Sequence, residues 1–76
     1  MGPYKLAKAV LAGSGKQTPP NGSTTTKPFT IFNPTTQDIT GVVGGNSVTF
    51  KNAQAGVLDV LFDEITTGTD IIGLWR

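Results

Sequence analysis

Residues 44–62 read GGNSVTFKNAQAGVLDVLF and contain two runs of alternating apolar and polar side chains. Such a period of two is typical of β-strands, whose successive side chains point to opposite faces. Turn residues come before each run, at Gly44-Gly45 and at 52–56. The apolar residues that share a face are Val48 with Phe50 in the first run, and Leu58 with Val60 and Phe62 in the second. We therefore expect two strands, each with one face turned towards a core.

The remainder of residues 29–76 has the same character. Further strands are expected at 29–32, 39–43 and 71–75, and the second run above continues to residue 65. Turn signals recur at roughly the 8–12-residue spacing of a sandwich or barrel, so we predict an all-β fold, a small β-sandwich or barrel of about five to six short strands. The expected core residues are Phe29, Ile31, Val48, Phe50, Leu58, Val60, Phe62, Ile72 and Leu74.

Residues 1–28 differ from the rest of the chain in composition and charge. Residues 13–28 have almost no apolar side chain, and Pro19-Pro20 favours an extended polyproline II conformation. The lysines at positions 5, 8, 16 and 27 all lie here, whereas all the acidic residues lie later. We predict an extended N-terminal docking arm over 1–28, followed by a small β domain over 29–76. The pattern of residues 3–11 fits either a two-turn helix or another strand.

The composition limits how this chain is stabilised and what it binds. With 76 residues and neither Cys nor His, it has no disulfide, and a zinc site would have to use carboxylates alone. Short domains without such links usually gain stability by oligomerisation. A net charge of +1 with 14% charged residues lacks the basic excess of a nucleic-acid-binding protein. We expect no specific nucleic-acid partner, no cofactor and no metal site.

Catalytic arrangements have little support in the sequence. Without His or Cys, the usual base for a Ser or Thr nucleophile is missing. Asp59 and Asp63 lie about 13 Å apart on an extended strand, too far for a glycosidase pair. Gly13 to Gln17 resembles the end of a phosphate-binding loop, but Val10 stands in place of its first Gly, and Gln17 in place of its hydroxyl residue. We expect no enzymatic activity and no small-molecule substrate. A calcium ion shared between subunits is the alternative role for the carboxylates.

Two segments are too apolar to be covered easily by a domain of this size. Leu61 and Ile65 share a face with Asp59 and Asp63 on the expected strand, and residues 71–75 are apolar on both faces. A strand that is apolar on both faces needs cover on both. A neighbouring subunit supplies that cover in one interpretation, and residues 3–11 fold back to supply it in the other. The residues expected to contact a partner are Tyr4, Lys5, Leu6, Lys8, Val10, Leu11, Leu61, Ile65, Ile71 and Trp75.

The order of elements from Val43 onward resembles the small spike-base and other capsid-associated virion proteins found in the heads of tailed phages and gene transfer agents. The residues that carry the resemblance are Gly44-Gly45, Val48-Thr49-Phe50, Ala55-Gly56, Leu58, Val60, Thr67-Gly68-Thr69 and Ile72-Gly73-Leu74-Trp75. Residues 39–43 depart from it, because relatives carry a longer strand with an aromatic residue there. The resemblance implies a β-barrel or sandwich module that attaches to a capsid as a symmetric oligomer.

We therefore expect a bacteriophage virion structural protein, a capsid-associated decoration, vertex or head-spike-base subunit that acts by protein–protein assembly. Its expected partners are the major capsid protein or other virion proteins, and further copies of itself in a homo-oligomer. The expected location is the virion, assembled in the cytoplasm of the bacterial host, with no membrane partner, because the apolar run 9–12 is shorter than that of a signal peptide. The alternatives are a tail or neck component, or a small non-virion binding module that uses an exposed strand edge.

Overall fold

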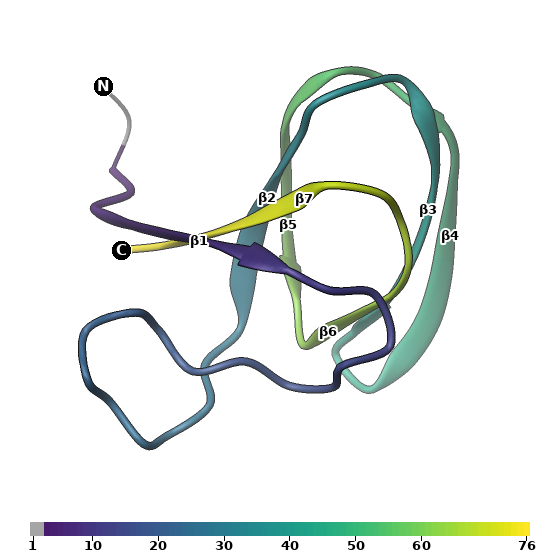
Figure 1. The fold of residues 1–76 in the computed structure, drawn as a ribbon. Coiled ribbons are helices and arrows are strands. Elements are labelled where there is room, and N and C mark those ends of the chain that lie inside the picture. Colours follow the sequence, from purple (N-terminus) through teal and green to yellow (C-terminus); the bar gives the residue numbers. More distant parts are fainter. Residues whose placement is uncertain (1–2) are drawn as a thin grey trace.

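The computed structural model describes residues 3–76, which form seven β-strands (Figure 1). In chain order the strands are β1 (Leu6–Val10), β2 (Phe29–Asn33), β3 (Gln37–Val43), β4 (Asn46–Ala53), β5 (Gly56–Phe62), β6 (Glu64–Thr67) and β7 (Ile71–Trp75). The described residues contain no helix, and so none that could cross a membrane. The prediction of an all-β fold is confirmed.

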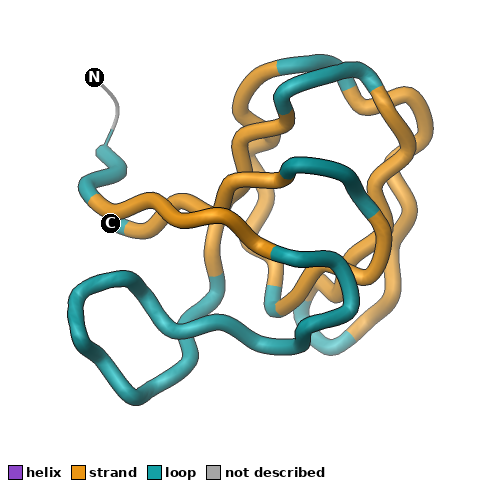
Figure 2. Tube along the Cα trace, viewed as in Figure 1, coloured by secondary structure: helices purple, strands orange, loops and turns teal. Residues whose placement is uncertain are grey.

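The strands form two antiparallel sheets (Figure 2). The four-stranded sheet has the order β1-β7-β2-β5, and the three-stranded sheet has the order β4-β3-β6. The hairpin between β3 and β4 turns at Gly44 and Gly45, with φ values of 57° and 84°. Two consecutive positive φ angles are typical of a type I′ turn, which explains why glycine occupies both positions.

The chain changes sheets at Asp63. Residues 57–65 were expected to form one strand, but β5 ends at Phe62 in the four-stranded sheet and β6 begins at Glu64 in the three-stranded sheet. The Asp63 N–H donates to the Val42 carbonyl at 2.7 Å, which ties the crossing point to β3. A strand that passes between packed sheets makes a corner of the sandwich. The alternation of side chains therefore does not continue across Asp63.

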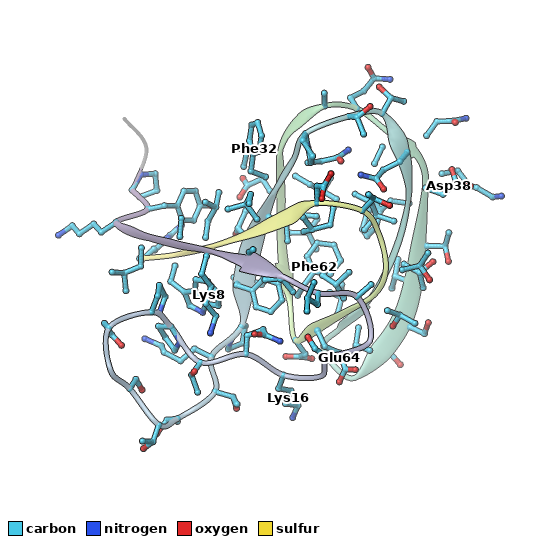
Figure 3. All side chains as sticks on the ribbon, in the orientation of Figure 1. Lys8, Lys16, Phe32, Asp38, Phe62 and Glu64 are labelled. Atoms are coloured by element: carbon cyan, nitrogen blue, oxygen red, sulfur yellow. The ribbon has the colours of Figure 1, made fainter. Side chains whose placement is uncertain are left out.

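The core lies between the two sheets. Phe29 and Ile31 of β2 meet Ile39 of β3 and Ile65 of β6, and all are fully buried. Figure 3 shows Phe62 pointing into this interior, where its ring meets that of Phe50 edge to face at 5.8 Å. Of the expected core, Phe29, Ile31 and Phe62 are buried, and Phe50, Leu58 and Val60 are partly buried and packed against the core. Val48 is also partly buried.

The prediction for β7 was wrong about which face of the strand is buried, because Ile72 and Leu74 were expected in the core. Ile71, Gly73 and Trp75 face the core, and Ile72 and Leu74 point to the outer side. The Trp75 ring packs against Phe29 at 5.3 Å between centroids. It lies so close to Gly73 that an added Cβ would approach the ring to 2.8 Å. Gly73 thus leaves the room on the inner face that an indole needs.

Residues 3–11 contain a strand that covers the edge of β7. β1 pairs with β7 in antiparallel register, with Lys8 opposite Gly73, and Val10 is buried. After β1, the Gly13 N–H donates to the Ile65 carbonyl at 2.8 Å, which links this segment to β6. Residues 3–11 therefore fold back as a neighbouring strand that covers the edge of β7, but its outer face, with Ile72 and Leu74, stays partly exposed.

The loop between β1 and β2 is held at its neck. The Lys27 N–H donates to the Gln17 carbonyl at 3.0 Å, and the Lys27 carbonyl accepts a hydrogen bond from Trp75 Nε1 at 3.3 Å. Pro19 is buried. Residue 28 is therefore not the limit of the folded part of the chain. A docking role for residues 1–28 stays a prediction.

Candidate functional site

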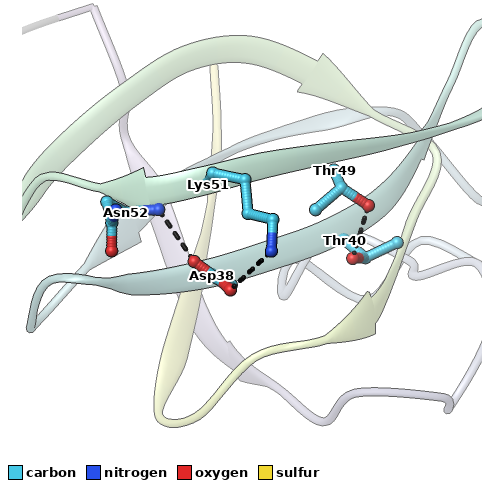
Figure 4. Close-up of polar contacts among 5 residues, drawn as sticks. All are labelled: Asp38, Thr40, Thr49, Lys51 and Asn52. Atoms are coloured by element: carbon cyan, nitrogen blue, oxygen red, sulfur yellow. Dashed lines mark hydrogen bonds and ion pairs between the residues drawn. The ribbon is translucent and has the colours of Figure 1, made fainter.

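The outer face of the three-stranded sheet carries polar contacts between β3 and β4 (Figure 4). The hydroxyls of Thr40 and Thr49 lie 2.9 Å apart, and Lys51 Nζ lies 3.6 Å from Asp38 Oδ2. Asp38 Oδ1 accepts a hydrogen bond from the Asn52 N–H at 2.8 Å. That hydrogen bond, together with the Lys51 charge, lowers the pKa of the Asp38 carboxyl below its ordinary value. This face has the character of an ordinary solvated surface.

The outer face of the four-stranded sheet carries an uncharged row of side chains. The strand register places Ala9 opposite Ile72, Ile72 opposite Phe32, and Phe32 opposite Val57. We call these four residues the apolar row. The Phe32 side chain is 41% exposed and points away from the sheets in Figure 3, and Val57 is 55% exposed. The row crosses all four strands, a width of about 14 Å at the usual strand spacing.

A continuous exposed apolar row has a physical cost. Apolar surface left in water loses about 25 cal/mol per Å² compared with buried surface. Single exposed apolar residues are common, but contiguous apolar patches mark interaction sites. The polar outer face of the other sheet shows that this chain can solvate a sheet surface with Thr, Ser and Lys. The apolar row is therefore the strongest candidate for a contact surface.

A groove of about 380 Å³ adjoins the apolar row. Tyr4 Oη lies 3.2 Å from Thr30 Oγ1 and 3.4 Å from Asp59 Oδ1, so the tyrosine reaches from the start of β1 towards β2 and β5. The Arg76 guanidinium lies 5.8 Å from the centroid of the same ring. The lining residues are Tyr4, Lys27, Pro28, Thr30, Asp59, Leu61, Leu74, Trp75 and Arg76. We call this the Tyr4 groove.

Four of the residues expected to contact a partner belong to the core instead. Val10, Ile65, Ile71 and Trp75 are at most 4% exposed. Ile65 is inside because the chain changes sheets at Asp63, which ends the face that it was expected to share with Leu61. The other three lie on the inner faces of the β1–β7 pair. The structure therefore places these four side chains in the core, although Trp75 also lines the Tyr4 groove.

The other expected contact residues lie at the surface or near it. Tyr4 and Leu61 line the Tyr4 groove, and their contact with a partner stays a prediction. Lys5 and Leu11 are exposed at the two ends of β1. Leu6 and Lys8 are partly buried on its inner side, and Lys8 Nζ lies 5.6 Å from the centre of the Trp75 ring.

The apolar row itself was missed in the sequence. Ile72 was assigned to the core, and Ala9, Phe32 and Val57 were given no role. The signal was present in residues 29–33, where Phe29 and Ile31 alternate with Thr30 and Phe32. Ile31 and Phe32 are consecutive apolar residues, and consecutive side chains of a strand point to opposite faces, so only one of them can face the core. An apolar residue on the outward side of a short strand was therefore predictable at Phe32.

The carboxylates do not gather at one point. Asp59 lies beside Tyr4, whereas Asp63 Oδ2 accepts a hydrogen bond from the Gly45 N–H at 3.1 Å. Within residues 3–76, no three side chains of the metal-ligating types come together. What the outer face of the four-stranded sheet offers is apolar contact, with Asp59, Lys27 and Arg76 at its border.

Comparisons with protein family models, curated proteins and solved structures give no match for this chain.

Proposed function

We propose that this protein is a structural subunit of a bacteriophage virion, associated with the capsid as a decoration, vertex or spike-base protein and acting through protein–protein assembly. The apolar row carries the proposal. Phe32 and Val57 are large, exposed and adjacent, on a face without a charged residue between them. A subunit that is permanently docked keeps such a face buried, so its exposure cost disappears on assembly.

Composition and resemblance support the same proposal. A chain with 14% charged residues has few charges to desolvate when a partner docks. The residues that carry the resemblance to spike-base proteins occupy structural positions. Gly44-Gly45 forms the β3–β4 turn, residues 48–50 lie in β4, and Trp75 fills the core beside Gly73.

The Tyr4 groove favours a second candidate, a small binding module outside the virion. Its volume of about 380 Å³ lies within the usual range of ligand sites. Asp59 and Leu61 in its wall belong to β5, an edge strand of the four-stranded sheet. An extended peptide can bind by adding to such an edge while its side chains enter a groove.

Purified particles distinguish the two candidates. Particles from the producing cells are banded on a density gradient and their proteins quantified by mass spectrometry. We expect this chain in a fixed ratio to the major capsid protein, and retained on isolated heads after tails are removed. Recovery on tails alone would support the tail or neck alternative. Recovery only in the soluble fraction would contradict the virion proposal and favour the binding module.

A pair of variants tests whether assembly into the particle requires the apolar row, either directly or through contact with a further copy of the chain. Val57→Lys places a charge on the apolar row, and Ser47→Lys places the same charge on the exposed outer side of β4. Particles that assemble with each variant should lack V57K and retain S47K. Equal retention of both variants would show that another surface docks the protein.

A further inference from the structure

We propose that the outer face of the four-stranded sheet docks on the same face of a second copy of this chain, with a two-fold axis parallel to the strands. The proposal deepens the assembly role proposed above and rests on it. In this arrangement β1 of one copy lies over β5 of the other, and β7 lies over β2. Sheets packed face to face lie about 10 Å apart, so the two apolar rows would interdigitate.

The sizes of the side chains argue for a second copy as the occupant. At one edge of the face, β1 carries small outward side chains, Ala7 and Ala9, both exposed. The β2–β5 half carries large ones, Phe32 and Val57. A two-fold axis between β7 and β2 places the alanines of β1 in one copy against β5 of the other. Ala9 then meets Val57 of the second copy, and Ile72 meets Phe32.

The charged residues on this face are also placed favourably by the two-fold rotation. Asp59 lies on the outer side of β5, two residues beyond Val57, and is exposed. Lys5 precedes β1 and shares the outward side with Ala7 and Ala9 by alternation. The two-fold axis brings Lys5 of each copy towards Asp59 of the other. The apolar row itself carries no charge that would have to be desolvated, and Arg76 lies beside it over the Tyr4 ring.

The area of a standard interface is a small part of the surface of this molecule. A standard interface takes about 800 Å² from each partner. That is less than a fifth of the 4549 Å² of accessible surface of this molecule. An isologous contact of this kind uses one patch twice, which suits a patch whose two halves complement each other.

The association state tests the proposal directly. The wild-type protein, at 7.9 kDa, should have a solution mass of twice that value by light scattering or sedimentation equilibrium. V57K should weaken self-association by roughly a hundredfold or more, because each dimer would bury two unpaired ammonium groups. S47K should associate like the wild type. Circular dichroism should show the same β-sheet spectrum for all three proteins.

Crosslinking tests the orientation and does not depend on a destabilised variant. The chain has no cysteine, so single cysteines report one position each. A mixture of Ala9→Cys and Val57→Cys proteins should form mixed dimers with a short bifunctional thiol reagent that spans about 10 Å. Ala9→Cys alone should crosslink poorly, because the two copies of residue 9 lie on opposite sides of the face, three strand spacings or about 14 Å apart along it.

The outcomes separate this inference from the proposed function. A monomeric wild type, dissociation by S47K as readily as by V57K, or preferential A9C–A9C crosslinks would each overturn the two-fold arrangement. A monomer that is still found in particles would leave the virion role standing and reject only the second copy. A dimer with the expected crosslinks that never enters particles would keep this inference and reject the virion role.

Discussion

At the scale of single residues, Gly73 sets how closely β1 and the Trp75 ring pack on β7. An added Cβ would lie 2.8 Å from Trp75 Cη2 and 2.8 Å from Val10 Cγ2. Both neighbours are buried in the core. We predict that Gly73→Ala lowers the free energy of unfolding by about 1–3 kcal/mol, the usual cost of overpacking a core. Urea titration followed by the fluorescence of Trp75 measures this loss.

A methyl group added at the surface provides the control for Gly73→Ala. Ser47→Thr adds one methyl on the exposed side of β4 and should change the free energy of unfolding by less than about 0.5 kcal/mol. If Gly73→Ala were as stable as Ser47→Thr, the close packing of Trp75 on Gly73 would not contribute to stability.

The lowered pKa of Asp38 links the ionisation of its carboxyl to the fold. Its pKa is lowered below 3.8 by the hydrogen bond from the Asn52 N–H and by Lys51. A depressed folded-state pKa stabilises the fold above the unfolded value, and that stabilisation is lost as pH falls through the folded pKa. Asp38→Asn should therefore melt below the wild type at neutral pH, and the gap should close progressively below pH 3.8. A gap that stays constant in thermal melts across this range would contradict the linkage.

At the scale of elements, β1 completes the four-stranded sheet. It pairs with β7 along five residue positions, and its Val10 closes one side of the core. We predict that deleting residues 2–12 exposes the inner face of β7 and abolishes cooperative unfolding. The single tryptophan reports the change, since its emission should shift to the red when Trp75 meets water.

A shortened loop is the matched control for the loss of β1. Replacing residues 20–25 by two glycines removes the loop tip but leaves the Gln17–Lys27 neck and Pro19 in place. Loop length has a weak effect on stability, so this variant should fold. A cooperative melt and a buried tryptophan in the variant without β1 would show that these residues are an accessory arm.

The same elements show what a sequence pattern can predict. Alternation in residues 47–51 and 57–62 assigned the inner faces of β4 and β5 correctly. It could not decide which face of β7 is inside, because both faces are apolar and a period of two has no direction. The alternation also could not locate the corner at Asp63. That corner depends on a hydrogen bond from the Asp63 N–H to the carbonyl of Val42 in another strand. These two errors also affected the predicted contact residues, because Ile71, Trp75 and Ile65 were expected at the surface and lie in the core. The predicted contact residues outside the core, such as Tyr4 and Leu61, remain candidates.

At the scale of the whole molecule, the two sheets present opposite outer faces. One carries Thr40, Thr49 and the Asp38–Lys51 pair, and the other carries the apolar row. A chain of this length buries only about 60% of its unfolded surface. Without cysteines it has no covalent link to compensate. Covering the apolar row in a dimer would supply additional burial on the face that needs it.

This coupling predicts that thermal stability depends on protein concentration. If the folded state is a dimer and the unfolded state is not, mass action stabilises folding as concentration rises. For a chain of this size, Tm should increase by about 3–5 °C for each tenfold increase in concentration. V57K should show a lower Tm that does not change with concentration, whereas S47K should follow the wild type. A wild-type Tm that is constant over a hundredfold range would mean that the fold is complete as a monomer, and the apolar row would then need a partner other than a second copy.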